Sequence, residues 1–427
     1  MPVWPQPNSP AAERVRDLHA TIAGVAAHGV ATAPATWAMV GEHTDAFGGV
    51  TVMGQAGLRA AAAVSPRDDD TIAVHISAAT ADGGEQVIKH STTLDALGEL
   101  SAAQSPTTDE EGQPVNPPAP TGGLGQRAAG IVWMMVNRQL LSRETGGMDL
   151  TVVCDIPLHA GLGAESAIDV ALALALLPDS EDPTEAPLRA RLAEVCHQAG
   201  TLFSLVPPLR ARHTTALRGK GTALTVIDYA DNSVTHATHP LGKDLAGIVI
   251  AAPSAADVSA GVAALHERGQ FIADALHAFG ADNLRLLPDA EIRVPEWLTA
   301  VHEVYGPKNQ PTVAEARRWL AYLDAETDRA EELTQALRSR RDIELVPLVH
   351  ASQEDMTANY GLTTAEELAA QARERGALGA RAASAGITNA VIAYVPATQA
   401  AAFVDAFAAD GYDIIVLDEG QPAELED

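Results

Sequence analysis

The sequence predicts a globular protein of two lobes that combines α-helices with β-strands. The chain has 427 residues, more than a single hydrophobic core usually holds. Hydrophobic residues make up 47% of it and charged residues 20%, which excludes a disordered or fibrous chain. Segments with helical spacing occur together with segments typical of strands. Because only 4% of the residues are aromatic, we expect Ala, Leu and Val to fill the core.

The first half of the chain predicts a helix, then strands, then a strand followed by a helix. These expectations rest on apolar periodicity and on Gly and Pro positions. The segments are a helix over 12–27, a strand pattern over 60–78 with a turn at 66–70, a helix over 126–141, a strand over 150–155 and a helix over 166–177. Residues 101–125 are rich in Pro, Gly, Thr and acidic side chains and predict an exposed loop.

The second half predicts two buried strands followed by helices. The strands are expected at 223–229 and 245–252, and the helices at 258–279, 313–323 and 329–339. A lobe boundary near 230–245 divides the chain into an N-terminal domain, 1–240, and a C-terminal domain, 241–427. We expect the acidic tail, 418–427, to be a solvated end.

Charge and hydropathy narrow the classes of partner. The net charge of −28 would repel a phosphate backbone, so nucleic acid is not an expected partner. No secretory signal and no apolar run of about 18 residues is found, which predicts a soluble protein without a membrane segment. Cys154 and Cys196 are expected to be buried hydrophobes in a reducing, cytoplasmic compartment. No protein partner is indicated.

The first candidate site is the run 40–49, where Glu42, His43 and Asp45 stand beside two glycines. Carboxylates accept hydrogen bonds from hydroxyls, and an imidazole can donate or accept, so these groups suit a polyhydroxylated ligand. The alternative is a helix cap at Thr44 or Asp45 followed by a turn at 48–49.

The second candidate is a glycine-rich turn that opens a helix, within 155–167. Free backbone N–H groups and the helix dipole at such a place attract anions. Many strand-to-helix turns contain glycine, however, so an ordinary turn is the alternative. A third run of small residues, 376–386, precedes a strand at 390–395 and by itself indicates close packing. The residues that would hold an anion at the second site are Gly161, Gly163, Ala164, Glu165 and Ser166.

Together and in this order, the three runs resemble the motifs of galactokinase, a member of the GHMP kinase superfamily. The resemblance covers about residues 30–415, nearly the whole chain. The run Gly-Glu-His-Thr-Asp at 41–45 lies at the same distance from an Ala-Pro pair as in the family. The matched segments are 33–34 with 41–45, 157–162, 350–352 and 376–381.

The resemblance implies an α+β, two-lobed GHMP kinase fold with the ligand cleft between the N-terminal and C-terminal domains. It implies transfer of the γ-phosphate of Mg-ATP to the anomeric hydroxyl of galactose, with ATP and Mg²⁺ as cofactors. Glu42, His43 and Asp45 take the sugar-binding positions within a signature loop at 33–49. Residues 155–167 are a remnant of the loop that holds the nucleotide phosphates.

Several positions depart from the family pattern. The catalytic Arg position is Thr36, so the cation is expected to be absent, and the position of the catalytic Asp is Arg212. The serines of the phosphate loop become Gly163, Ala164 and Glu165. A like charge about 4 Å from a phosphate costs roughly 4 kcal/mol at an effective dielectric near 20, so Glu165 would weaken ATP unless it ligates Mg²⁺ itself.

These departures favour a pseudokinase that has lost or strongly reduced phosphoryl transfer and acts as a sugar-binding or nucleotide-binding sensor or regulator. The alternative is an active small-molecule kinase of the superfamily, for galactose or a changed substrate, in which His213, Glu165 or Asp169 takes over the proton and metal roles. A scaffold without any ligand is a third reading, but it leaves the run 42–45 unexplained.

Overall fold

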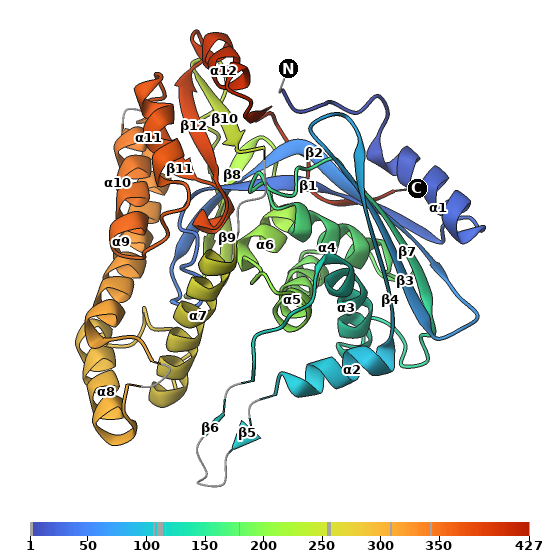
Figure 1. Cartoon of the computed structure of the whole chain (residues 1–427), viewed down its shortest axis with the longest axis horizontal. Coiled ribbons are helices and arrows are strands. Elements are labelled where there is room, and N and C mark those ends of the chain that lie inside the picture. The colour runs from blue at the N-terminus through green and yellow to red at the C-terminus, as the bar shows by residue number, and fades with distance from the viewer. Residues whose placement is uncertain are drawn as a thin grey trace.

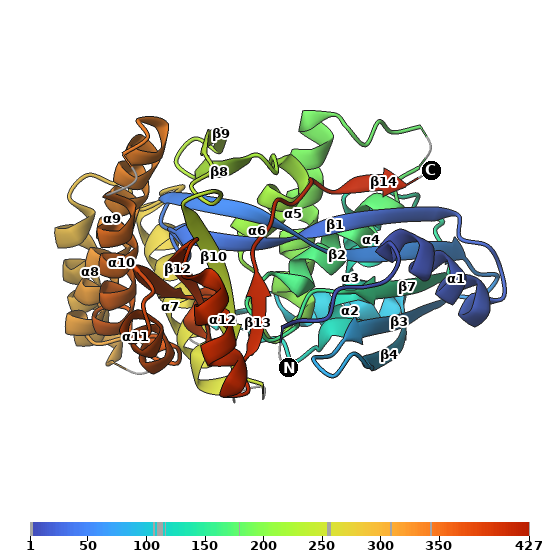
Figure 2. The same cartoon turned by 90° about the horizontal axis from the view of Figure 1, so that it is seen from above.

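The computed structural model describes residues 3–105, 107–108, 114–115, 117–178, 180–253, 258–307, 310–341 and 344–426. It is an α+β structure with two lobes that lie side by side (Figures 1 and 2). The N-terminal lobe is built on a large mixed sheet covered by helices. The C-terminal lobe is built on a smaller antiparallel sheet flanked by a layer of long helices.

The sheet of the N-terminal lobe has the strand order β14-β1-β2-β7-β3-β4, and β8 extends it by pairing with β2 and with β9. All its pairings are antiparallel except that of β3 with β7. The strands are β1 (Gly29–Val40), β2 (Val50–Pro66), β3 (Thr71–Ala79), β4 (Glu85–Thr93), β7 (Met148–Cys154), β8 (Ala223–Asp228), β9 (Ser233–Thr238) and β14 (Glu424–Glu426).

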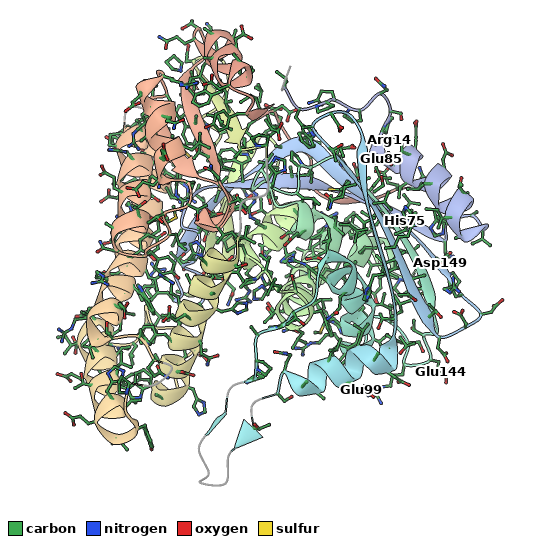
Figure 3. All side chains as sticks on the ribbon, viewed as in Figure 1. Arg14, His75, Glu85, Glu99, Glu144 and Asp149 are labelled. Carbon is green, nitrogen blue, oxygen red and sulfur yellow. The ribbon has the colours of Figure 1, made fainter. Side chains whose placement is uncertain are left out.

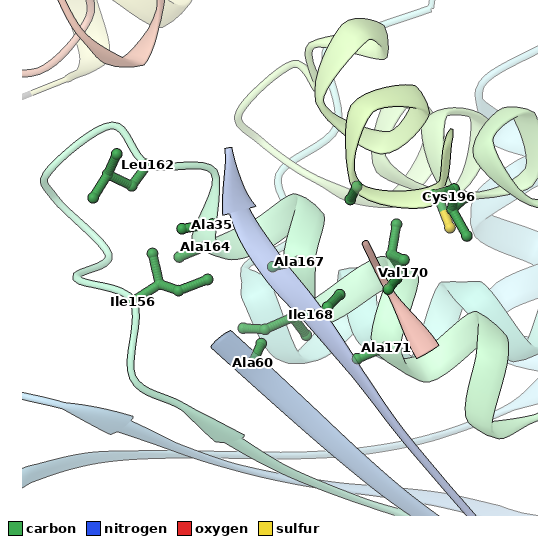
Figure 4. Close-up of a cluster of buried hydrophobic side chains, with 14 of the residues drawn as sticks. Ala35, Ala60, Ile156, Leu162, Ala164, Ala167, Ile168, Val170, Ala171 and Cys196 are labelled. Atoms are coloured by element: carbon green, nitrogen blue, oxygen red, sulfur yellow. The ribbon is translucent and has the colours of Figure 1, made fainter. Parts of the chain in front are cut away.

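Helices cover both faces of this sheet. On β2 the side chains alternate: Ala60 and Ala62 belong to the main core, whereas Ala61 and Ala63 pack against α1. Alanines on the helix and on the strands let α4 lie close to β1 and β2 (Figure 4). The expectation of an aliphatic core of small residues is confirmed. The helices of the lobe are α1 (Ala11–Ala23), α2 (Leu94–Ala103), α3 (Leu124–Asn137), α4 (Ala164–Ala175), α5 (Ala186–Phe203) and α6 (Arg210–Arg218).

The sheet of the C-terminal lobe has the order β11-β12-β10-β13 and is antiparallel. Val249 and Ile392 belong to the core cluster shared with the N-terminal lobe, whereas Ile248 and Val391 pack against the helices of their own lobe. Its strands are β10 (Leu245–Ala251), β11 (Gly379–Ala382), β12 (Ala390–Pro396) and β13 (Asp413–Val416). Its helices are α7 (Ser259–Phe279), α8 (Ala290–Tyr305), α9 (Val313–Arg338), α10 (Leu345–Ala358), α11 (Glu366–Glu374) and α12 (Ala400–Ala409).

Both chain ends cross between the lobes. Near the N-terminus, Trp4 donates its backbone N–H to the carbonyl of Ile414 in β13. The chain after β13 returns to the N-terminal lobe, where β14 pairs with the edge strand β1 (Figure 2). The guanidinium of Arg59 donates to the carbonyls of Gln421 and Pro422. The described part of the acidic tail is largely exposed to solvent, as expected, but these contacts hold it on the N-terminal lobe.

The structure confirms most of the expected elements and corrects others. The strands around the turn at 66–70 are found as β2 and β3, and the strand and helix around the glycine-rich turn are β7 and α4. The two helices expected at 313–323 and 329–339 are one continuous helix, α9. Within 101–125, the described residues include the end of α2, the strand pair β5 (Thr107–Thr108) and β6 (Pro114–Val115), and the start of α3. The boundary between domains 1–240 and 241–427 stays a prediction.

The remaining expectations concern the membrane and the cysteines. None of the helices in the described ranges is long and apolar enough to cross a bilayer. Cys154 and Cys196 are both free and buried, as expected. Burial raises the pKa of the Cys154 thiol to about 12, so this side chain behaves as a neutral hydrophobe.

Candidate active site

The loop between β1 and β2 carries Glu42, His43 and Asp45 to the junction of the two lobes. Gly41 starts the turn with a φ of 90°, and a Cβ there would lie 2.2 Å from the carbonyl oxygen of Val50, so glycine is required. The backbone N–H of Gly41 donates to Glu326 of α9 at 2.8 Å. The alternative reading, a helix cap at Thr44 or Asp45, is wrong because no helix follows before β2.

Glu42 is buried and lies between two arginines. Its Oε1 accepts from Arg212 of α6 at 3.1 Å, and its Oε2 accepts from Arg381 of β11 at 2.7 Å. Burial alone would raise the pKa of this carboxyl, but the two guanidinium groups outweigh it and hold the pKa below its ordinary value. Glu42 is therefore an ionised carboxylate whose two oxygens are each already bonded.

His43 and Asp45 line the same small space as Glu42. The His43 ring lies 5.2 Å from the ring of Tyr360, and the backbone of His43 has a φ of 75°. The space between these side chains and Arg210 has a volume of about 10 Å³. Because that is close to the minimum that a single water needs, the space is too small for a sugar in this conformation. The structure thus brings the three expected sugar-binding residues together around a space that is nearly filled.

Thr36 and Arg212, which are expected at the two family catalytic positions, are in contact. Arg212 donates through Nη1 to the backbone oxygen of Thr36, and its Nη1 lies 3.5 Å from the Thr36 hydroxyl. As the sequence indicates, position 36 on β1 carries a hydroxyl and no cation. A guanidinium stands beside Thr36, but it comes from α6 rather than from β1. The position expected to hold the proton acceptor supplies the positive charge instead.

The glycine-rich turn lies directly beside this contact. The backbone N–H of Thr36 donates to the carbonyl of Leu162 at 2.9 Å. Gly163, the N-cap of α4, has a φ of 69°, and a Cβ there would lie 2.6 Å from the Thr36 hydroxyl and 3.0 Å from Arg212 Nη1. Gly161, with a φ of 71°, similarly lies against Ser384 of the C-terminal lobe. Glycine at both positions permits these approaches.

A cavity of about 320 Å³ opens at the N-terminus of α4, between the two lobes. Gly161, Gly163, Ala164, Glu165 and Ser166 form one end of it. The first backbone N–H groups of α4 have no partner within the helix and point to this end. The other walls come from the segment 206–209 before α6, from α7 and from the segment after β11. Its volume is at the lower limit of sites for small molecules.

Glu165, in the first turn of α4, faces this cavity with a partly exposed carboxylate. The guanidinium of Arg127 on α3 donates to it at 2.9 Å. Burial and the nearby Asp169 raise the pKa of Glu165, although Arg127 and Arg212 oppose this shift. Among the residues that the structure describes, no group of three or more His, Cys, Asp or Glu could hold a metal ion. One carboxylate already paired with an arginine does not make a Mg²⁺ site by itself.

Two side chains considered as replacements for the catalytic base, Asp169 and His213, lie too deep for that role. Both are fully buried. Asp169 accepts from Arg127 at 2.6 Å and is bonded to the His213 ring at 2.9 Å. Burial lowers the pKa of His213, so the ring is neutral. Arg127 lines the cavity, whereas Asp169 and His213 do not.

The sequence analysis missed the charged group that joins the lobes beneath the site. It includes Arg381, which donates to Ser352 at 2.8 Å and lies 3.4 Å from Glu326. Arg381 and Ser352 stood in matched segments, but nothing in the spacing indicated that Glu326 or Arg127 would reach the site. Only the packing of α9 and α3 brings these two side chains there.

The chain is similar to known proteins over nearly its whole length. No family model matches the chain. Galactokinase from Streptomyces coelicolor is 26% identical over 415 residues, which cover 93% of this chain and 92% of that protein. The structure of Lactococcus lactis galactokinase complexed with galactose is similar with a TM-score of 0.68 at 16% identity, over 96% of this chain and 99% of that one. L. major mevalonate kinase in complex with R-mevalonate is similar with a TM-score of 0.54 at 12% identity, over 92% and 97% of the two chains.

The fold is therefore that of the GHMP kinases, with the site in the cleft between the lobes. In sequence, the chain is a homologue of galactokinase. The expected α+β fold class and the expected resemblance are both confirmed.

Proposed function

We propose that this galactokinase homologue binds a small molecule, a sugar or a nucleotide, as a sensor or regulator and has lost or strongly reduced the transfer of phosphate to galactose. The observation that carries the proposal is the contact of Arg212 with Thr36 and Glu42. A guanidinium has only donor N–H groups and stays protonated, so Arg212 cannot take a proton from a sugar hydroxyl. A positioned base is worth about 10² to 10⁴ in rate.

The sugar side of the cleft supports the same proposal. Phosphoryl transfer depends on the positioning of the acceptor hydroxyl and on charge stabilisation. Glu42 is bonded to two arginines, and the space beside Asp45 has a volume of about 10 Å³. Galactose would have to displace side chains that are already paired, which disfavours its binding in the orientation that catalysis requires.

The test is galactose-dependent consumption of ATP by the purified protein, followed with and without Mg²⁺. We expect no turnover above background. The double variant T36R/R212D returns a cation to β1 and a carboxylate to α6, and we expect it to gain turnover. The single variant R212D, which has the carboxylate without the cation, is the matched control and should gain less. Turnover of galactose by the unmodified protein would refute the proposal, whatever the variants do.

A second candidate is an active kinase with a changed substrate. It is favoured by one observation: the Glu165 carboxylate and Arg212 line the same cavity, so a possible base and a cation face one space. ATP consumption across a panel of sugars and alcohols tests this candidate. Turnover that disappears in Glu165→Ala but persists in Glu99→Ala would establish it, since Glu99 is an exposed glutamate on α2 (Figure 3) that does not line the cavity. No turnover on any acceptor would exclude it.

A further inference from the structure

We propose that Glu165 takes the place of a phosphate group at the N-terminus of α4, so that the cavity selects an uncharged ligand with an apolar ring face and hydroxyl groups over a nucleoside triphosphate. The inference rests on the proposed binding function and deepens it by naming the class of ligand. Three features of the cavity wall support it: its paired cations, its polar but uncharged side chains and its apolar side.

The cations on the described part of the wall already have anionic partners. Arg127 is bonded to Asp169 at 2.6 Å and to Glu165 at 2.9 Å, so two carboxylates share its one charge. Arg212 is paired with Glu42 at 3.1 Å. A phosphate that enters the cavity would therefore compete with a carboxylate for each guanidinium, and near Arg127 it would add to an excess of negative charge.

His159, the remaining basic side chain on the described wall, is also paired. Its Nε2 is bonded to Asp413 of β13 at 2.8 Å, and its ring contacts the edge of Trp4. The acidic partner is largely buried, which leaves the imidazole little attraction for a second anion. The pair also ties the glycine-rich loop to the C-terminal lobe, so His159 is held by the fold.

Glu165 places its own negative charge where an anion would bind. Glu165 lies in the first turn of α4, and part of its carboxylate surface is exposed to the cavity. A negative side chain in the first turn interacts favourably with the helix dipole. A bound phosphate would make the same interaction if the side chain were absent. The partial positive charge of the helix end is therefore already compensated within the chain.

The other walls suit a neutral molecule. Leu158, Val206, Leu209 and Leu265 present apolar surface to the cavity, against which a ring can pack. Uncharged hydrogen-bonding groups stand elsewhere on the wall and can bond hydroxyl or amide groups of a ligand without the cost of desolvating an ion. These polar groups are Gln86, Ser166, Ser384, Thr388 and Asn389.

The experiment compares adenosine with ATP, without metal, by isothermal titration calorimetry on the full chain. Adenosine is the probe for the uncharged class, and ATP has the same ring and sugar with a triphosphate added. We expect adenosine to bind the unmodified protein at least about tenfold more tightly than ATP. In Glu165→Gln, which keeps the shape and an acceptor for Arg127, we expect ATP to gain about tenfold or more and adenosine to change less than about twofold. Glu99→Gln is the matched control and should change neither affinity.

Each result decides the inference separately from the proposed function. ATP binding more tightly than adenosine in the unmodified protein, or an unchanged ratio of the two affinities in Glu165→Gln, would overturn the inference. Failure of adenosine to bind at millimolar concentration would overturn it as well. Thermal melting of each variant checks that it is folded, and Glu165→Ala provides a second removal of the charge if the first variant is unstable. Galactose turnover, in contrast, refutes the proposed loss of catalysis and leaves the ligand preference to be read from the titration.

Discussion

At the scale of single residues, Arg212 is bonded within the protein to both Thr36 and Glu42. With Thr36 on β1 there is space beside the strand, and the guanidinium of Arg212 fills it and is bonded to the backbone of Thr36. The cation in turn is paired with Glu42, a residue that the family motif assigns to the sugar. Charge pairing within the protein thus uses groups that would otherwise be available to a ligand.

A second consequence at this scale is a predicted dependence of stability on pH. His197 of α5 lies 6.4 Å from the ring of His213, and burial lowers the pKa of His197 to about 4. The unfolded chain, with an ordinary histidine pKa near 6.5, then binds a proton more readily than the folded chain. Stability is therefore lost as the pH falls through the range between these two values. For His197 alone, we expect a loss of about 1 kcal/mol between about pH 7.5 and about pH 5.5.

Urea unfolding at the two pH values measures this loss. In His197→Gln the fall in the free energy of unfolding should be smaller than in the unmodified protein by about 1 kcal/mol. The control is His277→Gln, at an exposed position near the end of α7, which should keep the full fall. An equal pH dependence in the unmodified protein and in His197→Gln would contradict the expectation. Carboxylates whose pKa is lowered, such as Glu42, Asp169 and the neighbouring Glu194, act at lower pH and do not disturb this comparison.

At the scale of elements, the sequence was informative where a local pattern determines the outcome. The strand β7, the turn with two glycines and the helix α4 were expected because β-branched residues, positive-φ glycines and a helical apolar run occur in order. Helix α9 was expected as two pieces, because acidic and polar side chains interrupt its apolar pattern. Its continuity comes from the neighbouring lobe, since buried Glu326 and Thr327 face the loop 41–49.

Contacts between distant elements could not be predicted in this way. The spacing of residues 42–45 indicated a ligand loop, but the pairing of Glu42 with Arg381 joins residues 339 positions apart. The position of the acidic tail could not be predicted either, because its composition is typical of a solvated end. The tail lies on the N-terminal lobe because the open edge of β1 accepts β14 as a further strand. The described outer side chains of the N-terminal lobe, such as Arg14, His75, Glu85 and Asp149 (Figure 3), likewise gave no signal of function in the sequence.

At the scale of the whole molecule, a buried charged group connects the two lobes. Glu42 belongs to the loop after β1, whereas Arg381 and Glu326 belong to β11 and α9 of the C-terminal lobe. Ser352, the backbone of Gly41 and the guanidinium of Arg329 also donate to Glu326. Since removal of one partner leaves another charge buried without compensation, such a group is costly to break even where it adds little net stability.

This connection gives a prediction for Arg381→Met, in which the volume is largely kept and the charge is lost. We expect the free energy of unfolding to fall by about 3 kcal/mol or more, because Glu42 and Glu326 would stay buried with fewer partners. Equilibrium unfolding in urea measures the loss. The control is Arg285→Met, since Arg285 also joins the lobes, through Asp228 and Glu331, but is partly exposed.

For the control we expect a loss of about 1 kcal/mol or less, as is usual for ion pairs in contact with solvent. Equal losses in the two variants would mean that the burial of Arg381 does not determine how much its ion pairs contribute to the free energy of unfolding. The double variant Arg381→Met with Glu42→Gln separates the two causes. If the loss of one of the two cations that compensate Glu42 is responsible, the second substitution restores part of the lost stability; if lost packing is responsible, the two losses add.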